Sequence, residues 1–128
     1  MPIRIVRLGT ARKRGEGVRI GTVRRPPRGV RKNQYSRQNW FDVWLPNLAP
    51  SAELMRDTWI HEDGTGWATF EKRYRAELKR PEQSHLLDAL VALSKRTTFS
   101  VGCYCADARR CHRSVLASVL RTRGARVK

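Results

Sequence analysis

The sequence predicts a single small α/β domain of Rossmann-like type, in which about four helices cover a mainly parallel sheet. Segments typical of strands lie near both ends of the 128 residues, and segments with helical periodicity fill the region between them. Parallel neighbours need crossover connections, and helices between strands supply them. A chain of this length buries one hydrophobic core, so we expect one domain over residues 1–128.

Two short strands are expected near the N-terminus. Residues 3–8 (IRIVRL) alternate apolar and basic side chains, as on a half-buried strand, and residues 18–23 (VRIGTV) form the second. The prolines of the following RRPPRG end this strand, because proline cannot donate to a sheet ladder. Only about nine residues join the two strands, too few for an ordinary helical crossover. A hairpin and a short parallel connection both stay open.

Three helices are expected in the middle of the chain. Aromatic residues and prolines in the segment 33–50 indicate a stretch that lies over the core rather than a long helix. Ser51 is a suitable N-cap for a helix near 52–60. Apolar side chains at helical spacing predict a second helix near 67–79, and a leucine-rich face predicts a third near 82–95.

The C-terminal part is predicted to hold the central strand and the last helix. Residues 97–104 (TTFSVGCY) are β-branched and aromatic, which favours a buried strand. The last helix is expected over 108–123, with Asp107 as its cap and Gly124 at its C-terminal end. The few residues that remain are expected to add an edge strand.

The charge of the chain indicates an anionic partner. Lys and Arg number 27 against 11 Asp and Glu, a formal net charge of +16 that attracts polyanions. An arginine-rich composition without any function would also explain part of this surplus. Between Arg4 and Arg37 the only carboxylate is Glu16. Nucleic acid, another polyanion or a small anionic ligand is therefore the expected partner. The expected nucleic-acid contacts are Arg12, Lys13, Arg14 and Arg24.

No export or membrane segment is evident. The beginning, MPIRIVRLG, lacks the apolar stretch of a signal peptide, and no segment approaches the ~20 apolar residues of a membrane span. The three cysteines are an odd number, so we expect reduced thiols rather than a disulfide framework. We therefore expect a cytoplasmic protein with no membrane partner and no cofactor.

The stretch CYCADARRCHR, residues 103–113, is the candidate site. It is predicted to run from a strand through a loop into the first turn of a helix, where open α/β sheets bind ligands. A phosphatase-like loop would pair a Cys103 thiolate with Arg109 around a phosphoryl group. The absence of glycine from this loop and the charge of Asp107 argue against it.

Two other interpretations of the stretch stay open. A zinc site would use Cys103, Cys105, Cys111 and His112. Adjacent helical residues point about 100° apart, so Cys111 and His112 would converge on one ion only with distortion, and the favoured interpretation is that no metal is bound. Alternatively Cys103 and Cys111 are small apolar core residues. His112 and Arg113, at a helix N-terminus, favour an anion in either case.

Several segments together resemble a known family: IRIVR at 3–7, PRG at 27–29, DVWLPNLAPS at 42–51, FEKRYRAEL at 70–78 and CHR at 111–113. They are similar to the YeaO-like branch of the proteins with domain of unknown function 488. The resemblance implies a compact bacterial α/β domain whose function the family name does not give. In the wider family an aspartate, an arginine and a proline–arginine pair face the cysteine–histidine–arginine helix.

The resemblance also implies which residues face that helix here. Arg25, Pro27 and Arg28 stand at the matching positions, whereas Arg24 replaces the aspartate. Any chemistry that needs this aspartate in relatives is therefore excluded for this chain. The triplet at 111–113, often absent from the YeaO-like branch, is present.

Three functions stay open from the sequence, and one of them is a regulatory or partner-binding module without catalysis. The first is binding of an anionic partner, most simply nucleic acid, through an arginine-rich surface. The second is a small enzyme for a phosphorylated or carboxylated metabolite, with Cys103 and His112 as catalytic residues. The expected fold places the loop after the second strand beside the last helix. The residues expected to converge there on one basic, anion-binding pocket are Arg25, Arg28, His112 and Arg113.

Overall fold

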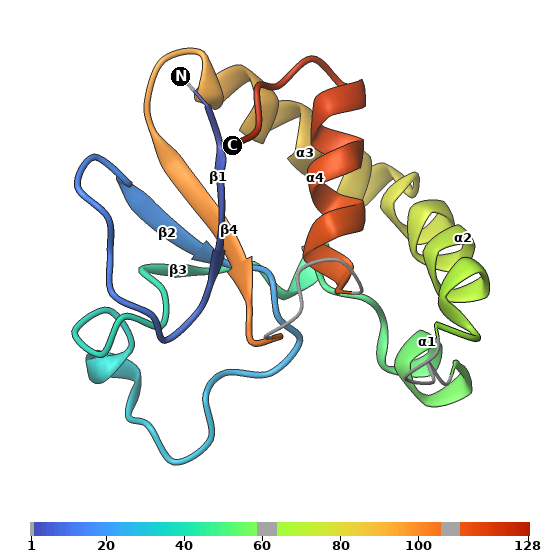
Figure 1. Ribbon diagram of the computed structural model, residues 1–128, viewed down its shortest axis with the longest axis horizontal. Helices are drawn as coiled ribbons and strands as arrows, with labels where there is room; N and C mark the ends of the chain where they lie inside the picture. The colour runs from blue at the N-terminus through green and yellow to red at the C-terminus, as the bar shows by residue number, and fades with distance from the viewer. Residues whose placement is uncertain (1, 59–63, 106–110) are drawn as a thin grey trace.

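A four-stranded parallel sheet with helices on one side forms the framework of the chain (Figure 1). The computed structural model describes residues 2–58, 64–105 and 111–128. The strands are β1 (Arg4–Arg7), β2 (Val18–Gly21), β3 (Val43–Trp44) and β4 (Phe99–Cys103), in the order β1-β4-β2-β3. The helices are α1 (Ala52–Asp57), α2 (Trp67–Leu78), α3 (Pro81–Ser94) and α4 (His112–Thr122). The α/β class expected from the sequence is confirmed.

Strand β4 is the centre of the sheet, as its composition predicts. All five of its residues are buried, and Val101 is the register partner of both Ile5 in β1 and Ile20 in β2. The first two strands are therefore not neighbours, and a hairpin between them is excluded. The C-terminus returns to the same sheet, because Val127 forms a parallel bridge with Ile3 at the outer side of β1.

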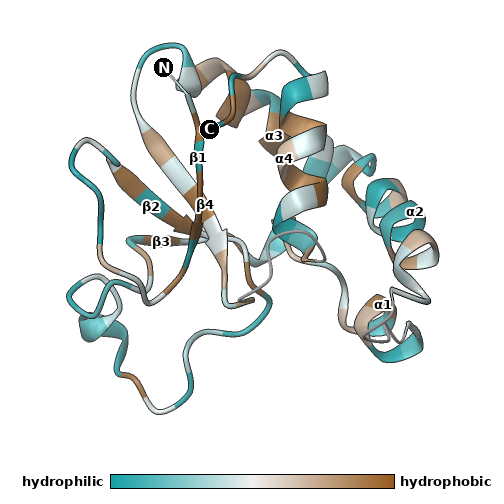
Figure 2. Cartoon of the chain, viewed as in Figure 1, coloured by the Kyte–Doolittle hydropathy of each residue, from teal (hydrophilic) through white to brown (hydrophobic). Residues whose placement is uncertain are grey.

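The main core lies between the sheet and the helices. Phe99 and Val101 project from β4 into this core, where Leu116 and Leu120 of α4 meet them. Figure 2 shows the corresponding apolar residues along the strands and on α3 and α4. The opposite side of the sheet is covered by the long connections around β2 (Figure 1). Within the described residues, no helix combines the length and the apolar character that a membrane crossing requires.

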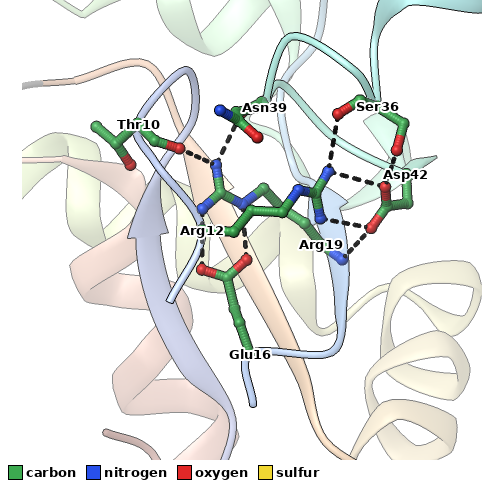
Figure 3. A network of polar contacts seen from close by, with 7 residues as sticks. All are labelled: Thr10, Arg12, Glu16, Arg19, Ser36, Asn39 and Asp42. Carbon is green, nitrogen blue, oxygen red and sulfur yellow. Dashed lines mark hydrogen bonds and ion pairs between the residues drawn. The ribbon is translucent and has the colours of Figure 1, made fainter. Parts of the chain in front are cut away.

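A buried arginine fastens these connections to the sheet (Figure 3). The side chain of Arg19 in β2 is completely buried and pairs with the carboxylate of Glu16 through two hydrogen bonds of 2.9 Å. Its remaining nitrogen donates to the backbone carbonyls of Thr10 and Asn39, at 2.9 and 2.7 Å. One guanidinium thus satisfies carbonyls from the loops before and after β2. The Asn39 carbonyl also accepts from the backbone N–H of Gly9 at 2.8 Å, so Arg19 adds to a bond that already joins the two loops.

A second arginine extends this network toward the surface (Figure 3). Arg12 makes two bonds of 2.8 Å to the carboxylate of Asp42, which also accepts from the hydroxyl of Ser36 and from the backbone N–H of Arg19. Burial alone would raise the pKa of the Asp42 carboxyl, but the bonds from Arg12 and Ser36 outweigh it and lower that pKa. The connection between β1 and β2 is held without any helix.

Two details differ from the sequence-based expectations. Strand β3 was not expected, since its two exposed residues, Val43 and Trp44, carry no alternating pattern. Helix α4 begins at His112 rather than at 108, with Cys111 as an extended N-cap residue. Asp107, the expected cap, lies outside the described residues.

Candidate functional site

Two neighbouring pockets open at the carboxyl ends of the strands, where parallel α/β sheets bind ligands. The first, which we call the arginine groove, has a volume of about 1020 Å³, and the second, the thiol pocket, about 400 Å³. Arg25 and Tyr104 contribute to both, so the two hollows share a wall. The loop after β2 and the end of β4 supply this wall.

The arginine groove combines exposed positive charge with aromatic rings. Its walls include the exposed arginines Arg7, Arg25 and Arg28. Tyr35 and Trp40, from the connection between β2 and β3, are half-buried in the same walls. Among the described residues that line this groove, none is acidic. No carboxylate among these lining residues therefore neutralises the positive charge of the arginines.

Tyr104 organises the boundary between the two pockets. Its ring meets that of Trp40 edge to face, with centroids 5.8 Å apart, and its hydroxyl donates to the carbonyl of Arg25 at 2.9 Å. The Nε of Arg7 donates to the Tyr104 carbonyl at 3.3 Å. One residue after β4 thereby ties together the ends of β1, β2 and the aromatic loop.

The thiol pocket has apolar walls and a polar end. Ala49, Pro50 and Met55 form part of the apolar wall. Cys103, Cys105 and His112 line the same pocket, together with Arg24 and Arg25. Of the three cysteines, Cys103 and Cys111 are buried and Cys105 is exposed. A ligand in this pocket would meet the Cys105 thiol before the other two.

The structure brings Cys103, Cys111 and His112 together, although adjacent residues of a helix were expected to diverge. Their ligand atoms all lie within 4.8 Å of one another, and the two Sγ atoms are 2.7 Å apart. The Nδ1 of His112 lies 3.9 Å from the Sγ of Cys111. The expected divergence fails because Cys111 is not helical: its φ of −130° and ψ of 152° are those of extended chain.

The three thiols differ in their acidity. Hydrogen bonding to Cys105, together with burial, raises the pKa of the Cys103 thiol to about 11. Hydrogen bonds from Cys103 and Cys111 lower the pKa of Cys105, and the nearby charges of His112 and Arg113 act in the same direction. Burial lowers the pKa of His112, so its ring is neutral at neutral pH. The exposed thiol of Cys105 is therefore the first of the three to lose its proton.

The expected single basic pocket is divided between two places. Arg25 and His112 share the thiol pocket, whereas Arg28 lines only the arginine groove. Arg113 is 5% exposed and lines neither of the two pockets. Residues 109 and 107, which bear on the phosphatase-like interpretation, lie outside the described residues.

The other basic residues expected at a nucleic-acid surface have separate surroundings. Arg12 is held by Asp42, and the Nε of Arg24 donates to the carbonyl of Pro50 at 2.9 Å. Lys13 and Arg14 are exposed in the connection between β1 and β2, and they line neither pocket.

Sequence reasoning missed the groove residues Arg7, Tyr35, Trp40 and Tyr104. The aromatic signal was present in the segment 33–50, but it was assigned to covering the core.

The comparisons with known proteins give one match. A family model described as the active DUF488-N3 subclade matches residues 3–124, nearly the whole chain. No curated protein and no solved structure matches the chain. The match agrees with the resemblance of the segments at 27–29, 42–51 and 111–113. The chain therefore belongs to the DUF488 family, in its active DUF488-N3 subclade.

Proposed function

We propose that this protein binds single-stranded nucleic acid in the arginine groove, with little dependence on base sequence. The observation that carries the proposal is the meeting of uncompensated arginines with aromatic rings in one groove, at Arg7, Arg25, Arg28, Tyr35 and Trp40. Basic side chains that follow a phosphate backbone, next to aromatic side chains that contact bases, are the usual means of binding single strands.

The charge of the groove supports this proposal more directly than the net charge of the chain does. Arg12 and Arg19 are neutralised by Asp42 and Glu16, so they have no charge to offer a ligand. Arg25 and Arg28 are exposed, and no carboxylate stands among the described residues of their groove. An anion is the partner that such a groove requires.

The size and shape of the groove favour a chain over a small molecule. Its volume of about 1020 Å³ lies at the upper limit of roughly 300–1,000 Å³ typical of small-molecule sites. Its rings are half-buried and engaged with one another, as in the pair Trp40–Tyr104. They offer edges and partial faces to a base rather than a specific hydrogen-bond pattern. We therefore expect weak sequence preference and a strong dependence on salt.

The test is a fluorescence anisotropy titration of a labelled oligoribonucleotide at several salt concentrations. Contacts to about three phosphates predict a slope of log K against log salt near −2, since each contributes about −0.7 for a single strand. The double variant Arg25→Ala/Arg28→Ala removes two of these contacts, so the slope should become shallower, with a magnitude below about 1. The measurement is repeated with DNA of the same sequence and with duplex.

A matched control removes the same charge elsewhere. Lys95 and Arg96 are exposed and directly follow α3. They precede β4 and therefore lie at the amino ends of the strands, whereas the groove lies at the carboxyl ends. The variant Lys95→Ala/Arg96→Ala should keep the wild-type slope. Equal losses in both double variants would mean that only net charge acts, and the groove would have no special role. Absence of binding at low salt would refute the proposal altogether.

The adjacent thiol pocket favours a second candidate function, a small enzyme for a phosphorylated or carboxylated metabolite. Arg25 stands at the boundary of the pocket, where it can bind the anion, and Cys103, Cys105 and His112 line the interior. Within this candidate Cys103 and His112 remain the proposed catalytic residues and Arg25 the anion-binding one, whereas Arg28 lies in the neighbouring groove. The lower pKa of Cys105 adds it as the thiol most ready to react.

Alkylation by iodoacetamide tests this second candidate. A thiol activated for catalysis should react faster than the free amino acid at neutral pH, and inorganic phosphate should protect it by occupying the pocket. Peptide mapping identifies which of the three cysteines is modified. Slow modification that phosphate leaves unchanged would exclude a catalytic thiol here.

A further inference from the structure

We propose that Cys103, Cys105, Cys111 and His112 bind one zinc ion at the carboxyl end of β4. This inference is independent of nucleic-acid binding, because none of these four residues lines the arginine groove. The donor set, thiolate sulfur with imidazole nitrogen, is the one that zinc prefers in tetrahedral protein sites. It departs from the sequence-based expectation of no metal, and the reason is the extended conformation of Cys111.

The spacing of the donor atoms suits a tetrahedral ion. Zn–S bonds of about 2.3 Å and Zn–N bonds of about 2.0–2.1 Å place neighbouring ligand atoms roughly 3.4–3.8 Å apart. The Sγ of Cys111 lies 3.9 Å from His112 Nδ1 and 2.7 Å from Cys103 Sγ. An ion would thus require the two sulfurs to separate by about 1 Å, a change that side-chain rotation provides. The backbone already brings the donors together.

The imidazole of His112 makes the hydrogen bond that is typical of a metal-bound histidine. Its Nε2 lies 2.7 Å from the carbonyl oxygen of Thr22, and since a carbonyl only accepts, Nε2 carries the proton. Nδ1 is then the unprotonated nitrogen, and it is the nitrogen that lies near Cys111. A metal-bound histidine commonly donates its second N–H to a backbone carbonyl in this way. The ring of Tyr74, edge to face at 5.9 Å, fixes the orientation further.

Cys105 supplies the fourth ligand. It follows Cys103 by two residues, and it lines the thiol pocket together with Cys103 and His112. It is also the exposed member of the cluster, so an ion can enter from the thiol pocket through its side. Structural zinc sites are closed by four protein ligands, and this set closes one.

The charge near the cluster points in the same direction. Arg113 is 5% exposed, and its Nε has no hydrogen-bond partner within the described part of the chain. Arg113 stands two residues after Cys111, in the first turn of α4. Three thiolates, one neutral imidazole and Zn²⁺ carry a net charge of −1. Such a group balances a buried guanidinium, which is otherwise costly to desolvate.

The experiment measures zinc on the purified full-length protein. Reduced protein is supplied with zinc, dialysed, and analysed by inductively coupled plasma mass spectrometry. We expect one ion per chain, released when a mercurial blocks the thiols. Cobalt in place of zinc should give the intense visible bands of a tetrahedral site together with thiolate charge-transfer absorption. Neither readout requires an assay of function.

Matched variants identify the ligands. Cys105→Ser changes an exposed residue, so we expect it to fold and to bind zinc at least roughly 100-fold more weakly, a larger loss than a second-shell change produces. His112→Asn should lose the metal as well, with circular dichroism to confirm folding. Met55→Leu, in the wall of the same pocket, should bind zinc as the wild type does.

Three results would overturn the assignment. The first is substoichiometric zinc on fully reduced protein, and the second is unchanged zinc affinity of Cys105→Ser. The third is a Cys103–Cys111 disulfide under non-reducing peptide mapping that persists when zinc is present during purification. Alkylation after incubation with zinc separates this inference from the enzyme candidate. Bound zinc should protect all three cysteines, whereas a catalytic thiol that binds no zinc would still react rapidly.

Discussion

Replacing Arg19 by methionine should destabilise the protein severely, although the residue lies outside both pockets. The guanidinium is fully buried and makes four hydrogen bonds, two to Glu16 and one each to the carbonyls of Thr10 and Asn39. Removing one partner of a buried ion pair costs about 3–5 kcal/mol, because the other charge is left unpaired. A domain has only about 5–15 kcal/mol of stability, so the loss should be a large fraction of the total. Urea denaturation followed by tryptophan fluorescence measures it.

Two further variants test the reasoning. Arg12→Met also removes a bidentate arginine–carboxylate pair, but its side chain is 27% exposed, so we expect a cost of about 1 kcal/mol or less. The double variant Arg19→Met/Glu16→Leu removes the stranded carboxylate, and it should be more stable than Arg19→Met alone. We expect a coupling energy between the two positions of about 1–3 kcal/mol. If Arg19→Met costs no more than Arg12→Met, the argument from burial is wrong.

The effect of pH gives an independent check. Burial would raise the pKa of Glu16, but the hydrogen bonds and charge of Arg19 outweigh it and hold that pKa below the usual 4.5. The stabilisation from this carboxylate is therefore complete above the unfolded pKa and is lost as pH falls through the lower, folded pKa. In Arg19→Met, the two largest contributions that oppose burial are lost, and only the weaker ones from the Lys13 backbone and Arg12 remain, so the pKa of Glu16 should rise and acidification toward pH 4.5 should destabilise the variant less than the wild type. The stability gap between wild type and variant should narrow from pH 7 to pH 4.5, and a constant gap would contradict this.

Two other substitutions should affect stability through the fold. A Cβ at Gly21 would lie 2.3 Å from Cδ2 of Phe41, so Gly21→Ala should cost about 1–3 kcal/mol; thermal unfolding measures the loss, and Phe41→Leu should recover part of it. Ser51 caps α1 by accepting from the N–H of Leu54 at 3.0 Å, and Ser51→Ala should lower the free energy of unfolding by about 1 kcal/mol. Ser51→Thr keeps the capping oxygen and should lose less than half of that amount in urea denaturation.

Elements with a repeated pattern could be predicted from the sequence. The apolar spacing in 67–79 and 82–95 specifies helices wherever the chain places them, and the structure has α2 and α3 there. Strand β3 has only two residues and no buried face, so its pairing with β2 depends on the rest of the sheet. The start of α4 was misplaced by four residues, because alanine and arginine at 108–110 fit a helix as well as a loop.

The burial of Arg19 could not be predicted from local pattern. In the strand Val18–Gly21 it alternates with Ile20, which indicates a side chain on the polar face of the sheet. That face is covered by the two long connections, and the position of those connections is a tertiary property. The opposite error concerns Val18, an apolar residue of the same strand that remains 47% exposed. Alternation assigned the two faces correctly, but it could not show that both faces are covered at residues 19–21 while Val18, at the start of the strand, stays exposed.

The candidate site illustrates the same limit for charge. The surplus of basic residues predicted an anionic partner, yet it could not tell structural arginines from available ones. Arg12 and Arg19 are joined to carboxylates that lie within 30 residues of them in sequence, while Arg25 and Arg28 have none in their groove. It follows that loss of stability and loss of binding should separate: Arg19→Met should reduce stability without removing a groove contact, whereas Arg28→Ala should weaken anion binding in a protein that unfolds as the wild type does.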